Sequence, residues 1–557
     1  MMTGNRLKLL TGIFLPIFLL LPVMVMAQLN RGGVPISFTY ALAPDDRSIV
    51  RLTPPDLSAV RSEDEQNPLP YRFAINLPAS IDIRRDGFWT TAGNGSDLWR
   101  ITIHAPGALA ITLYFDRFHL PADGRFFVYS PDRSRLLGAF TELNNQETNT
   151  FATALVAGDQ VTLEYNAPAG SPVPELHLSE VAYAYRGVES PEGGERTGFG
   201  ASGPCEVNVK CSEGNDWQNQ SRSVARVEVK RGTASVWCTG SLVNNTRNDG
   251  TPYLLTADHC GRLSTTQDLS QWVVYFNYQG TACPNPALEP SYRAMTGVRL
   301  IAHGGGGGNT GSDFYLVRML NPIPDTFNVY FNGWSRDTIP SPSGSSIHHP
   351  QGDIKKISTY TTPLIRSTWN YPYQYTHWKV KWSKTANGQG VTEGGSSGSP
   401  LYDDNGLLVG TLTGGDSRCD SLHVDLSDYY GMFSYHWDRN GTDSSSVLKY
   451  WLDPIQSDVK EVNGWALGTG SHPYTADFVI YPNPVTSLLT VKAPAAMNQG
   501  VTEIHIADLW GKLRLTVRWN PAHEAEKQLD LSGWAPGIYF LTTGDISSRV
   551  MRKIIKL

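Results

Sequence analysis

The sequence predicts an all-β protein in which three folded domains follow a secretory signal. The chain has 557 residues, 40% of them hydrophobic, and is too long to fold around a single core. Short segments in which apolar and polar residues alternate recur between Pro, Gly and Asp turns, which is typical of β-strands. All six cysteines lie between Cys205 and Cys419, so we expect the middle of the chain to be one disulfide-linked unit.

Residues 1–27 have the features of a secretory signal. Basic residues at Arg6 and Lys8 precede a long apolar run that ends in the small-residue context VMA before Gln28. A membrane anchor is the alternative, but two prolines interrupt the run and a cleavage context follows it. No later segment is apolar for the roughly 20 residues of a membrane span. We therefore expect a secreted chain with no transmembrane segment in its mature form.

Residues 28–199 form the first predicted domain, a β-rich propeptide. This segment has no cysteine, and residues 99–103, 109–115 and 160–165 alternate as strands do. Short strands between turns predict a β-sandwich, and the Gly- and Glu-rich stretch 189–195 predicts a linker at its end. We expect this domain to assist folding and to block the site of the next domain. An ordinary carbohydrate- or protein-binding sandwich is the alternative.

The remaining chain divides into two further units. Residues 200–465 are rich in Gly, Tyr and Trp, with short β-type segments such as 272–276 and a helix expected at 446–452. Residues 466–476 contain Gly, Ser and Pro and predict a linker. Residues 477–557 return to short strands and predict a last, small β-sandwich.

Charge and cysteine spacing argue against two classes of function. The net charge is −6 and the sequence pI is about 6.1, which gives no electrostatic reason to expect nucleic acid as a partner. No cysteine pair has the C-x-x-C spacing and no His-x-x-x-His accompanies them, so zinc is not expected. We expect no metal and no cofactor.

A histidine beside a cysteine is the first candidate for catalysis. Residues 254–260, LLTADHC, form an apolar strand end that delivers His259 next to Cys260. A general base must be held in one orientation, and a disulfide at the neighbouring residue can fix its loop. Cys238 is the candidate disulfide partner. The alternative is a histidine that merely packs near a disulfide.

An acid follows in chain order. Asp313 opens the apolar segment GSDFYLV after the glycine run 304–308. A carboxylate at the mouth of a buried strand can accept the hydrogen bond of the histidine Nδ1 and stabilise the imidazolium. Asp258 and Asp268 are rivals, but Asp258 is adjacent to His259 in sequence, so its side chain should point elsewhere.

The candidate nucleophile lies in residues 392–400, TEGGSSGSP. Glycines on both sides let a tight turn expose one hydroxyl, and the backbone N–H groups of Gly395 and Ser397 can then face a developing oxyanion. Ser396 competes with Ser397, because GGSSG also matches the G-x-S-x-G turn of α/β-hydrolases. A flexible linker is a further alternative, but the strand-like segment 407–412 follows directly.

Residue order decides between the two serines. An α/β-hydrolase needs its acid and its histidine after the serine, whereas here the best histidine and acid precede it, in the order His259, Asp313, Ser397. This order favours Ser397 as the nucleophile.

Together these segments resemble the bacterial lysyl endopeptidases, a branch of the trypsin-like serine peptidases. The resemblance covers the second domain and implies a chymotrypsin-like double β-barrel with His259, Asp313 and Ser397 as its triad. It also implies the disulfides Cys205–Cys419, Cys211–Cys283 and Cys238–Cys260, where counting alone leaves many pairings open. The matching segments are 203–205, 211–214, 238–246, 255–260, 347–350, 390–400, 427–431 and 451–454.

A pocket for a cationic side chain needs a buried carboxylate, because a lone buried charge is unfavourable. Asp416, Asp420, Asp425 and Asp428 lie downstream of the serine. The resemblance selects Asp428 as the lysine-recognising residue. It also implies Trp369 at the pocket rim, but the histidine on which this tryptophan stacks in the family is replaced by Thr413. Acceptance of arginine therefore stays open.

The same motif bears on activation. Pancreatic-type relatives pair a new N-terminus with an acid before the nucleophile, but that position is Ser396 here and no IVGG start exists. We expect instead that the propeptide inhibits the enzyme until cleavage between Arg186 and Gly200, for example after Arg196.

The last unit resembles the C-terminal sorting domain of the type IX secretion system. The resemblance implies an Ig-like β-sandwich, export across the outer membrane by that machinery, and either release or attachment to the cell surface. The matching segments are 480–485, 506–512, 529–532, 535–541 and 553–557.

The sequence thus predicts a secreted serine endopeptidase that cuts proteins and peptides after lysine through an acyl-enzyme. A Lys/Arg-tolerant protease and a non-catalytic binding protein on a protease fold are the alternatives. An esterase is disfavoured by residue order and by the lack of a βαβ rhythm.

Overall fold

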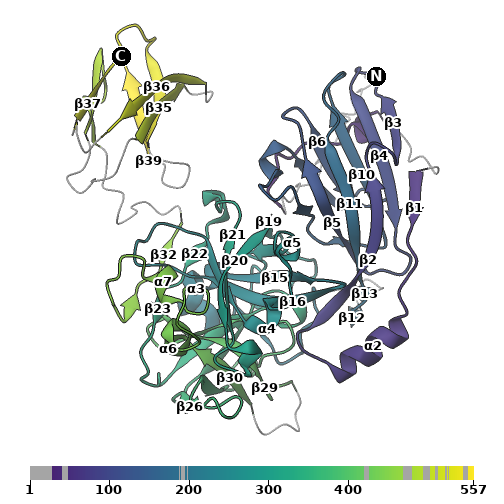
Figure 1. The fold of residues 1–557 in the computed structure, drawn as a ribbon, viewed down its shortest axis with the longest axis vertical. Helices are drawn as coiled ribbons and strands as arrows, with labels where there is room; N and C mark the ends of the chain where they lie inside the picture. Colours follow the sequence, from purple (N-terminus) through teal and green to yellow (C-terminus); the bar gives the residue numbers. More distant parts are fainter. Residues whose placement is uncertain are drawn as a thin grey trace, which may run out of the picture.

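The computed structural model describes residues 28–40, 48–186, 188–189, 195–196, 198–419, 426–467, 479–492, 502–508, 512–520, 524, 526–543 and 550–557. Their regular structure is mainly β-strand, as predicted (Figure 1). The expected signal, residues 1–27, and most of the expected linker lie outside these residues. No helix in the described ranges is long and apolar enough to cross a membrane.

The N-terminal domain is a sandwich of two antiparallel-rich sheets, as predicted. The predicted strands 99–103, 109–115 and 160–165 fall in β4, β5 and β10. One sheet has the order β1 (Ile49–Arg51), β4 (Asp97–His104), β10 (Gln160–Ala167), β6 (Arg125–Tyr129) and β7 (Leu136–Phe140), with β3 (Phe88–Thr91) beside β4. The other contains β2 (Arg72–Asp82), β11 (Glu175–Ala184), β5 (Ala110–His119) and β8 (Phe151–Ala152), with β9 (Val156–Ala157) beside β5.

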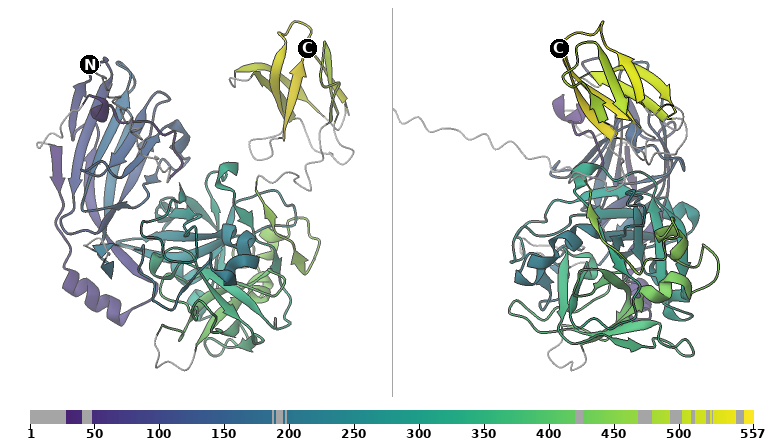
Figure 2. Two further views of the ribbon diagram at one scale, coloured as in Figure 1. Left: turned by 180° about the vertical axis from the view of Figure 1, so that it is seen from behind. Right: turned by 90° about the vertical axis from the view of Figure 1, so that its left-hand side faces the viewer.

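The middle domain is a chymotrypsin-like double β-barrel, with its sheets seen from two sides in Figure 2. The first barrel contains β15 (Val224–Arg231), β16 (Ala234–Leu242), β17 (Tyr253–Thr256), β18 (Val273–Phe276), β19 (Arg293–Thr296), β20 (Val298–Gly304) and β21 (Phe314–Met319). The second contains β24 (Gly344–His348), β25 (Lys356–Tyr360), β27 (His377–Lys381), β28 (Pro400–Tyr402), β29 (Leu408–Gly415) and β30 (Ser427–Met432), with β14 (Val207–Asn208), β26 (Ile365–Ser367), β23 (Trp334–Ser335) and β31 (Glu461–Val462) at its edges.

The first barrel and the N-terminal sandwich share one sheet, which the sequence does not predict. Strand β2 pairs antiparallel with β16 in the register Ala234↔Ile75 and Ser235↔Ala74, so the order runs β18-β15-β16-β2-β11-β5. In Figure 1, β2 runs from the sandwich to the barrel. The two domains also share a core, in which Trp237 of the barrel packs with residues of the sandwich. Pairing with β2 therefore covers the edge of β16.

The helices are short. The expected helix at 446–452 is a single turn, α7 (Lys449–Leu452), because residues before it form a turn in which Ser446 N–H bonds Asp443 O. Two further helices, α2 (Leu57–Gln66), capped by Asp56, and α6 (Phe433–Asp438), were not predicted. Six residues of α6 are too few for a helical period to show in the sequence. The others are α1 (Ile36–Thr39), α3 (Gln218–Ser223), α4 (Asp258–Gly261) and α5 (Thr266–Leu269).

The barrel extends slightly past residue 465. Strand β32 (Trp465–Ala466) pairs with β22 (Tyr330–Phe331), and Leu467 N–H bonds Val329 O. Two residues of the expected linker 466–476 therefore belong to the barrel by their hydrogen bonds.

The C-terminal domain is a small two-sheet sandwich, as predicted. Its core includes Leu489, Ile504 and Leu541. One sheet has the order β33 (Val479–Tyr481), β34 (Leu488–Lys492) and β37 (Glu526–Asp530), and the other β36 (Leu513–Trp519), β35 (Thr502–Asp508), β38 (Gly537–Thr543) and β39 (Val550–Lys556).

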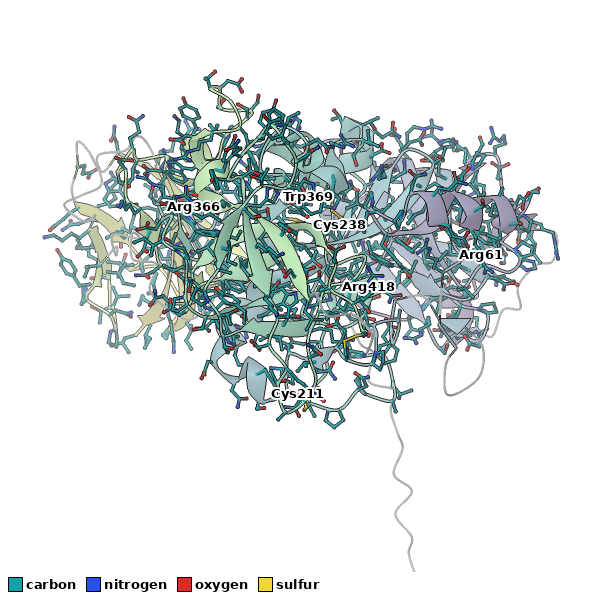
Figure 3. The ribbon with its side chains drawn as sticks, turned by 90° about the horizontal axis from the view of Figure 1, so that it is seen from below. Arg61, Cys211, Cys238, Arg366, Trp369 and Arg418 are labelled. Atoms are coloured by element: carbon teal, nitrogen blue, oxygen red, sulfur yellow. A yellow bond between two sulfur atoms is a disulfide. The ribbon has the colours of Figure 1, made fainter. Side chains whose placement is uncertain are left out.

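Three disulfides link the middle domain, and they are the pairings that the resemblance implies: Cys205–Cys419, Cys211–Cys283 and Cys238–Cys260. Cys211 and Cys238 are labelled in Figure 3.

Candidate active site

His259 and Asp313 meet at the interface of the two barrels. His259 lies in the single turn α4, directly after β17. Asp313 Oδ2 accepts from His259 Nδ1 at 2.8 Å, and Asp313 Oδ1 accepts from the backbone N–H of His259 at 3.0 Å. Oδ2 thus orients the imidazole, while Oδ1 holds the backbone that carries it. Burial raises the pKa of Asp313, but the charge of His259 and the hydrogen bonds outweigh it and hold this pKa below its usual value.

The turn that presents Asp313 is conformationally demanding. Asp313 has φ of 59°, a left-handed conformation that is uncommon for a residue with a side chain. Gly305 packs against this turn, and a Cβ on Gly305 would collide with Asp313 N. The glycine run that precedes Asp313 therefore allows the close approach of the two segments.

The rival acids have other partners. Asp258 accepts from His303 Nδ1 and from Gly307 N–H, each at 2.8 Å, and so anchors the glycine run. Asp268 pairs with Lys230 at 2.6 Å. Neither contacts the His259 ring.

Ser397 lies close to the Cys238–Cys260 disulfide. Its carbonyl accepts from Thr239 N–H at 2.8 Å and lies 3.9 Å from Cys260 Sγ. The Cys238–Cys260 disulfide thus joins the helical turn of His259 to β16, the strand that positions Ser397. In the described part of the chain His259 Nε2 is buried and has no hydrogen-bond partner, so the Ser397 hydroxyl is not within hydrogen-bond distance of it in this structure.

The turn of residues 392–400, called the nucleophile turn because it contains the candidate nucleophile Ser397, requires glycine at two positions. Gly395 and Gly398 have φ of 96° and 81°, and a Cβ on Gly398 would collide with Thr256 Oγ1. The carbonyl of Gly395 accepts from Thr239 Oγ1 at 2.9 Å. Among the described residues the backbone N–H groups of Gly395 and Ser397 have no acceptor, which leaves them free for a developing oxyanion.

Ser396 is turned into the second barrel. Its fully buried hydroxyl contacts His348 Nδ1 at 2.8 Å and accepts from Glu393 N–H at 3.2 Å. Its hydroxyl is therefore engaged by His348 and Glu393 and does not face His259.

We expect Ser396→Ala to lower stability and to spare the chemistry. The change leaves the buried His348 Nδ1 without a partner, which costs about 1–3 kcal/mol of unfolding free energy. Urea unfolding and kcat/KM, measured on the same preparation, separate the two effects, and kcat/KM should stay within about tenfold of the native value. A rate loss as large as that of Ser397→Ala would show that we have chosen the wrong serine.

Asp428 is a buried carboxylate surrounded by neutral donors. It is 1% exposed. Its Oδ2 accepts from Trp382 Nε1 at 2.6 Å, Thr392 Oγ1 at 2.8 Å and Ser417 Oγ at 2.6 Å, and among the described residues Oδ1 accepts only from Ser417 N–H at 3.3 Å. No described Lys, Arg or His forms an ion pair with it. Burial outweighs these hydrogen bonds and raises the pKa of Asp428.

Asp428 lies close to the nucleophile turn. Thr392, one of its donors, precedes Ser397 by five residues, and a Cβ on Gly415 would collide with Asp428 Oδ1. Of the other candidate acids, Asp416 is exposed, and Asp420 and Asp425 lie outside the described residues.

A histidine does contact Trp369, although residue 413 is a threonine. The rings of Trp369 and His377 lie 5.9 Å apart, and His377 Nε2 is 2.9 Å from Thr413 Oγ1. Thr413 also helps to lower the pKa of Asp313, so it lies between His377 and the acid. Burial lowers the pKa of His377 to about 4, which keeps the ring neutral near pH 7. Trp369, labelled in Figure 3, is 36% exposed.

Sequence reasoning missed His377, Trp382 and Ser417. They lie on a strand or in connecting segments far from the serine motif, and no spacing pattern marks them. Only the folding of β27, β29 and β30 into one sheet brings them together.

Comparison with known proteins agrees with this geometry. Residues 199–431 match the family model of the lysyl endopeptidase C-terminal domain, and residues 479–557 match that of the secretion system C-terminal sorting domain. Over 362 residues the chain is 29% identical to a lysyl endopeptidase of Pseudomonas aeruginosa, covering 62% of this chain and 75% of that protein.

Solved structures that match part of this chain include the protease Anisep from Arthrobacter nicotinovorans and a Glu endopeptidase. Anisep is 16% identical and covers 38% of this chain and 90% of its own, with a TM-score of 0.27. The Glu endopeptidase is 19% identical and covers 42% and 93%, with a TM-score of 0.25.

The double barrel and the family match define this protein as a serine protease. Within that class, its middle domain matches the family model of the lysyl endopeptidase C-terminal domain. The C-terminal sorting domain directs the chain through type IX secretion to the cell surface or the extracellular space.

Proposed function

We propose that this protein is a secreted endopeptidase that hydrolyses peptide bonds on the carboxyl side of lysine. The observation that carries the proposal is Asp428, a buried carboxylate beside the nucleophile turn whose hydrogen-bond donors, within the described part of the chain, are all neutral. A buried charge of this kind is stabilised by a cationic partner, which a lysine ammonium of the substrate supplies.

The pattern of donors on Asp428 favours lysine over arginine. Three donors already fill Oδ2, while Oδ1 accepts from one. A guanidinium binds a carboxylate best through two parallel hydrogen bonds to both oxygens, whereas an ammonium acts as a point charge that needs one free site. Asp428 therefore suits a single ammonium contact at Oδ1.

In this proposal Ser397 Oγ attacks the carbonyl carbon of the lysine residue, and His259 Nε2 takes the hydroxyl proton. The N–H groups of Gly395 and Ser397 stabilise the oxyanion, and Asp313 stabilises the imidazolium. His259 then returns the proton to the leaving amine, which frees the C-terminal fragment and leaves an acyl-enzyme. Water, activated by the same histidine, releases the N-terminal fragment and restores Ser397.

The specificity is tested with matched peptides that have either lysine or arginine before the cut and are otherwise identical. We expect kcat/KM for the lysine peptide to exceed that for arginine by about 10²-fold, a value typical of a mismatched charged pair. Equal values would support the Lys/Arg-tolerant alternative.

We also propose that the N-terminal domain is an inhibitory propeptide. Leu69 Cδ1 lies 3.9 Å from the site of a Cβ on Gly414, beside the Asp428 pocket. Tyr71 packs over Gly394, and its hydroxyl donates to Gln351 Oε1 at 3.1 Å. Residues 69–71 thus lie across the approach to Ser397. Cleavage between Arg186 and Gly200, for example after Arg196, would cut the connection between the domains.

We expect Tyr71→Gly to weaken this block. Removing the ring opens the space over Gly394, so a fluorophosphonate should label Ser397 of the uncleaved chain at least about tenfold faster, as loss of a buried aromatic contact allows. The rate of labelling, followed by mass spectrometry, measures this. Phe88→Gly, an exposed aromatic in the N-terminal sandwich, is the matched control. Identical slow labelling of the native chain and both variants would contradict the proposed block.

A further inference from the structure

We propose that the edge of β16 and the ring of Trp237 bind the substrate downstream of the scissile bond, and that they favour a large aromatic or apolar side chain at the third or fourth residue after the cut. This inference rests on the proposed function. It assigns a specificity-determining role to a residue that the catalytic site does not use.

An extended segment of this chain already occupies the surface. The backbone of β2 pairs with β16, where Trp237 N–H donates to Tyr71 O at 2.9 Å and Asn76 N–H donates to Thr233 O at 2.9 Å. Hydrogen bonds between backbones do not depend on side chains, so any extended peptide can replace β2 here once the N-terminal domain leaves.

The direction of this segment is that of a substrate bound with its lysine at Asp428. Leu69 lies beside Gly414 near the Asp428 pocket, Tyr71 lies over Gly394 in the nucleophile turn, and Phe73 lies on Trp237. A peptide that runs from the pocket across the turn therefore continues onto β16 after the cut. Phe73 is the fourth residue after Leu69 and the third after Pro70, so the fourth or the third residue after the cut reaches the position of Phe73, according to which of the two the lysine replaces.

Trp237 forms a rigid aromatic platform. Phe73 stacks on it with ring centroids 4.0 Å apart and an angle of 11° between the planes. The Arg226 guanidinium lies 4.4 Å from the Trp237 ring and also contacts Tyr275 and Tyr278, at 4.2 and 4.0 Å. Arg226 donates to Gly352 O at 2.8 Å, which ties this cluster to the loop that packs beside Gly395.

Arg72, the neighbour of Phe73 in β2, directs its charge to the N-terminal domain and not to the barrel. Arg72 pairs with Asp64 at 2.7 Å and Glu63 at 3.0 Å, both within the N-terminal domain. Phe73 is thus the side chain by which this part of β2 packs on Trp237. A substrate with Phe, Tyr or Leu at this position would restore the same contact.

The inference is tested on the mature protein with internally quenched peptides that contain a single lysine. Phe or Ala is placed in turn at each of the four positions after this lysine. We expect Phe at the third or fourth position to raise kcat/KM about tenfold over Ala, as an aromatic stack allows, and Trp237→Ala to abolish this ratio. Tyr450→Ala, an exposed aromatic on α7, is the control and should keep the ratio.

Fluorophosphonate labelling of each variant confirms that the compared proteins are folded, and Trp237→Leu replaces Trp237→Ala if the latter does not fold. The inference is overturned if no position shows a preference for Phe, or if the ratio survives in the Trp237 variant. Peptides that are not cut after lysine at all would instead contradict the proposed function.

Discussion

Ser397→Ala should reduce kcat/KM for lysine peptides by about 10⁵-fold or more, the largest effect expected of any single change in this chain. The Ser397 hydroxyl is the proposed attacking group, and no other hydroxyl in the turn replaces it, because Ser396 is bound to His348 inside the barrel. The methyl group of alanine fits the space of the serine side chain, so the fold should be retained.

Ser396→Ala is the matched control for this result. The two changes remove the same atom one residue apart, and only Ser397→Ala should abolish labelling by a fluorophosphonate. Retained cleavage by Ser397→Ala protein, once contaminating protease is excluded, would contradict the assigned nucleophile.

Asp428→Asn should lower kcat/KM for lysine peptides by about 10²- to 10⁴-fold, the second largest effect. Loss of one partner of a buried ion pair costs about 3–5 kcal/mol, because the substrate ammonium would enter the pocket without a counter-charge. The amide also places an NH₂ group against donors from Trp382, Thr392 and Ser417, which adds a mismatch.

The fluorophosphonate rate is the control for Asp428→Asn. This probe carries no lysine, so its reaction with Ser397 reports whether the turn is still formed. If the variant keeps its lysine preference, recognition depends on another acid, such as Asp416. If the variant loses labelling as well, Asp428 holds the turn and its role in specificity is unsupported.

The sequence predicts the local features of this protein well. His259, Asp313 and Ser397 each stand near a strand end with an identifiable motif, and the strands β17 and β21 beside the first two are largely apolar in sequence. The same holds for the disulfides, since the resemblance supplies the pairing that counting cannot. These features depend on short segments and on residue order.

Features that depend on contacts between distant segments could not be predicted. Nothing in residues 71–76 marks them as partners of β16, because the same alternation suits any sheet. His377 reaches Thr413 only through the pairing of β27 with β30 and of β30 with β29. The left-handed backbone of Asp313 is likewise set by its packing with Gly305.

The covered edge of β16 links the proposals on inhibition and on substrate binding. One segment of the N-terminal domain both lies across the nucleophile turn and pairs with the strand that a substrate would use. Removal of this domain would then free the catalytic site and its downstream binding surface in one step.

The central claim is tested most directly by digesting a denatured protein mixture with the mature protein. Mass spectrometry of the products then identifies the residue before each cut. We predict that lysine precedes nearly every cut and that a fluorophosphonate stops all cleavage. Cuts spread over arginine or apolar residues, or cleavage that persists after fluorophosphonate treatment, would contradict a lysine-directed serine endopeptidase.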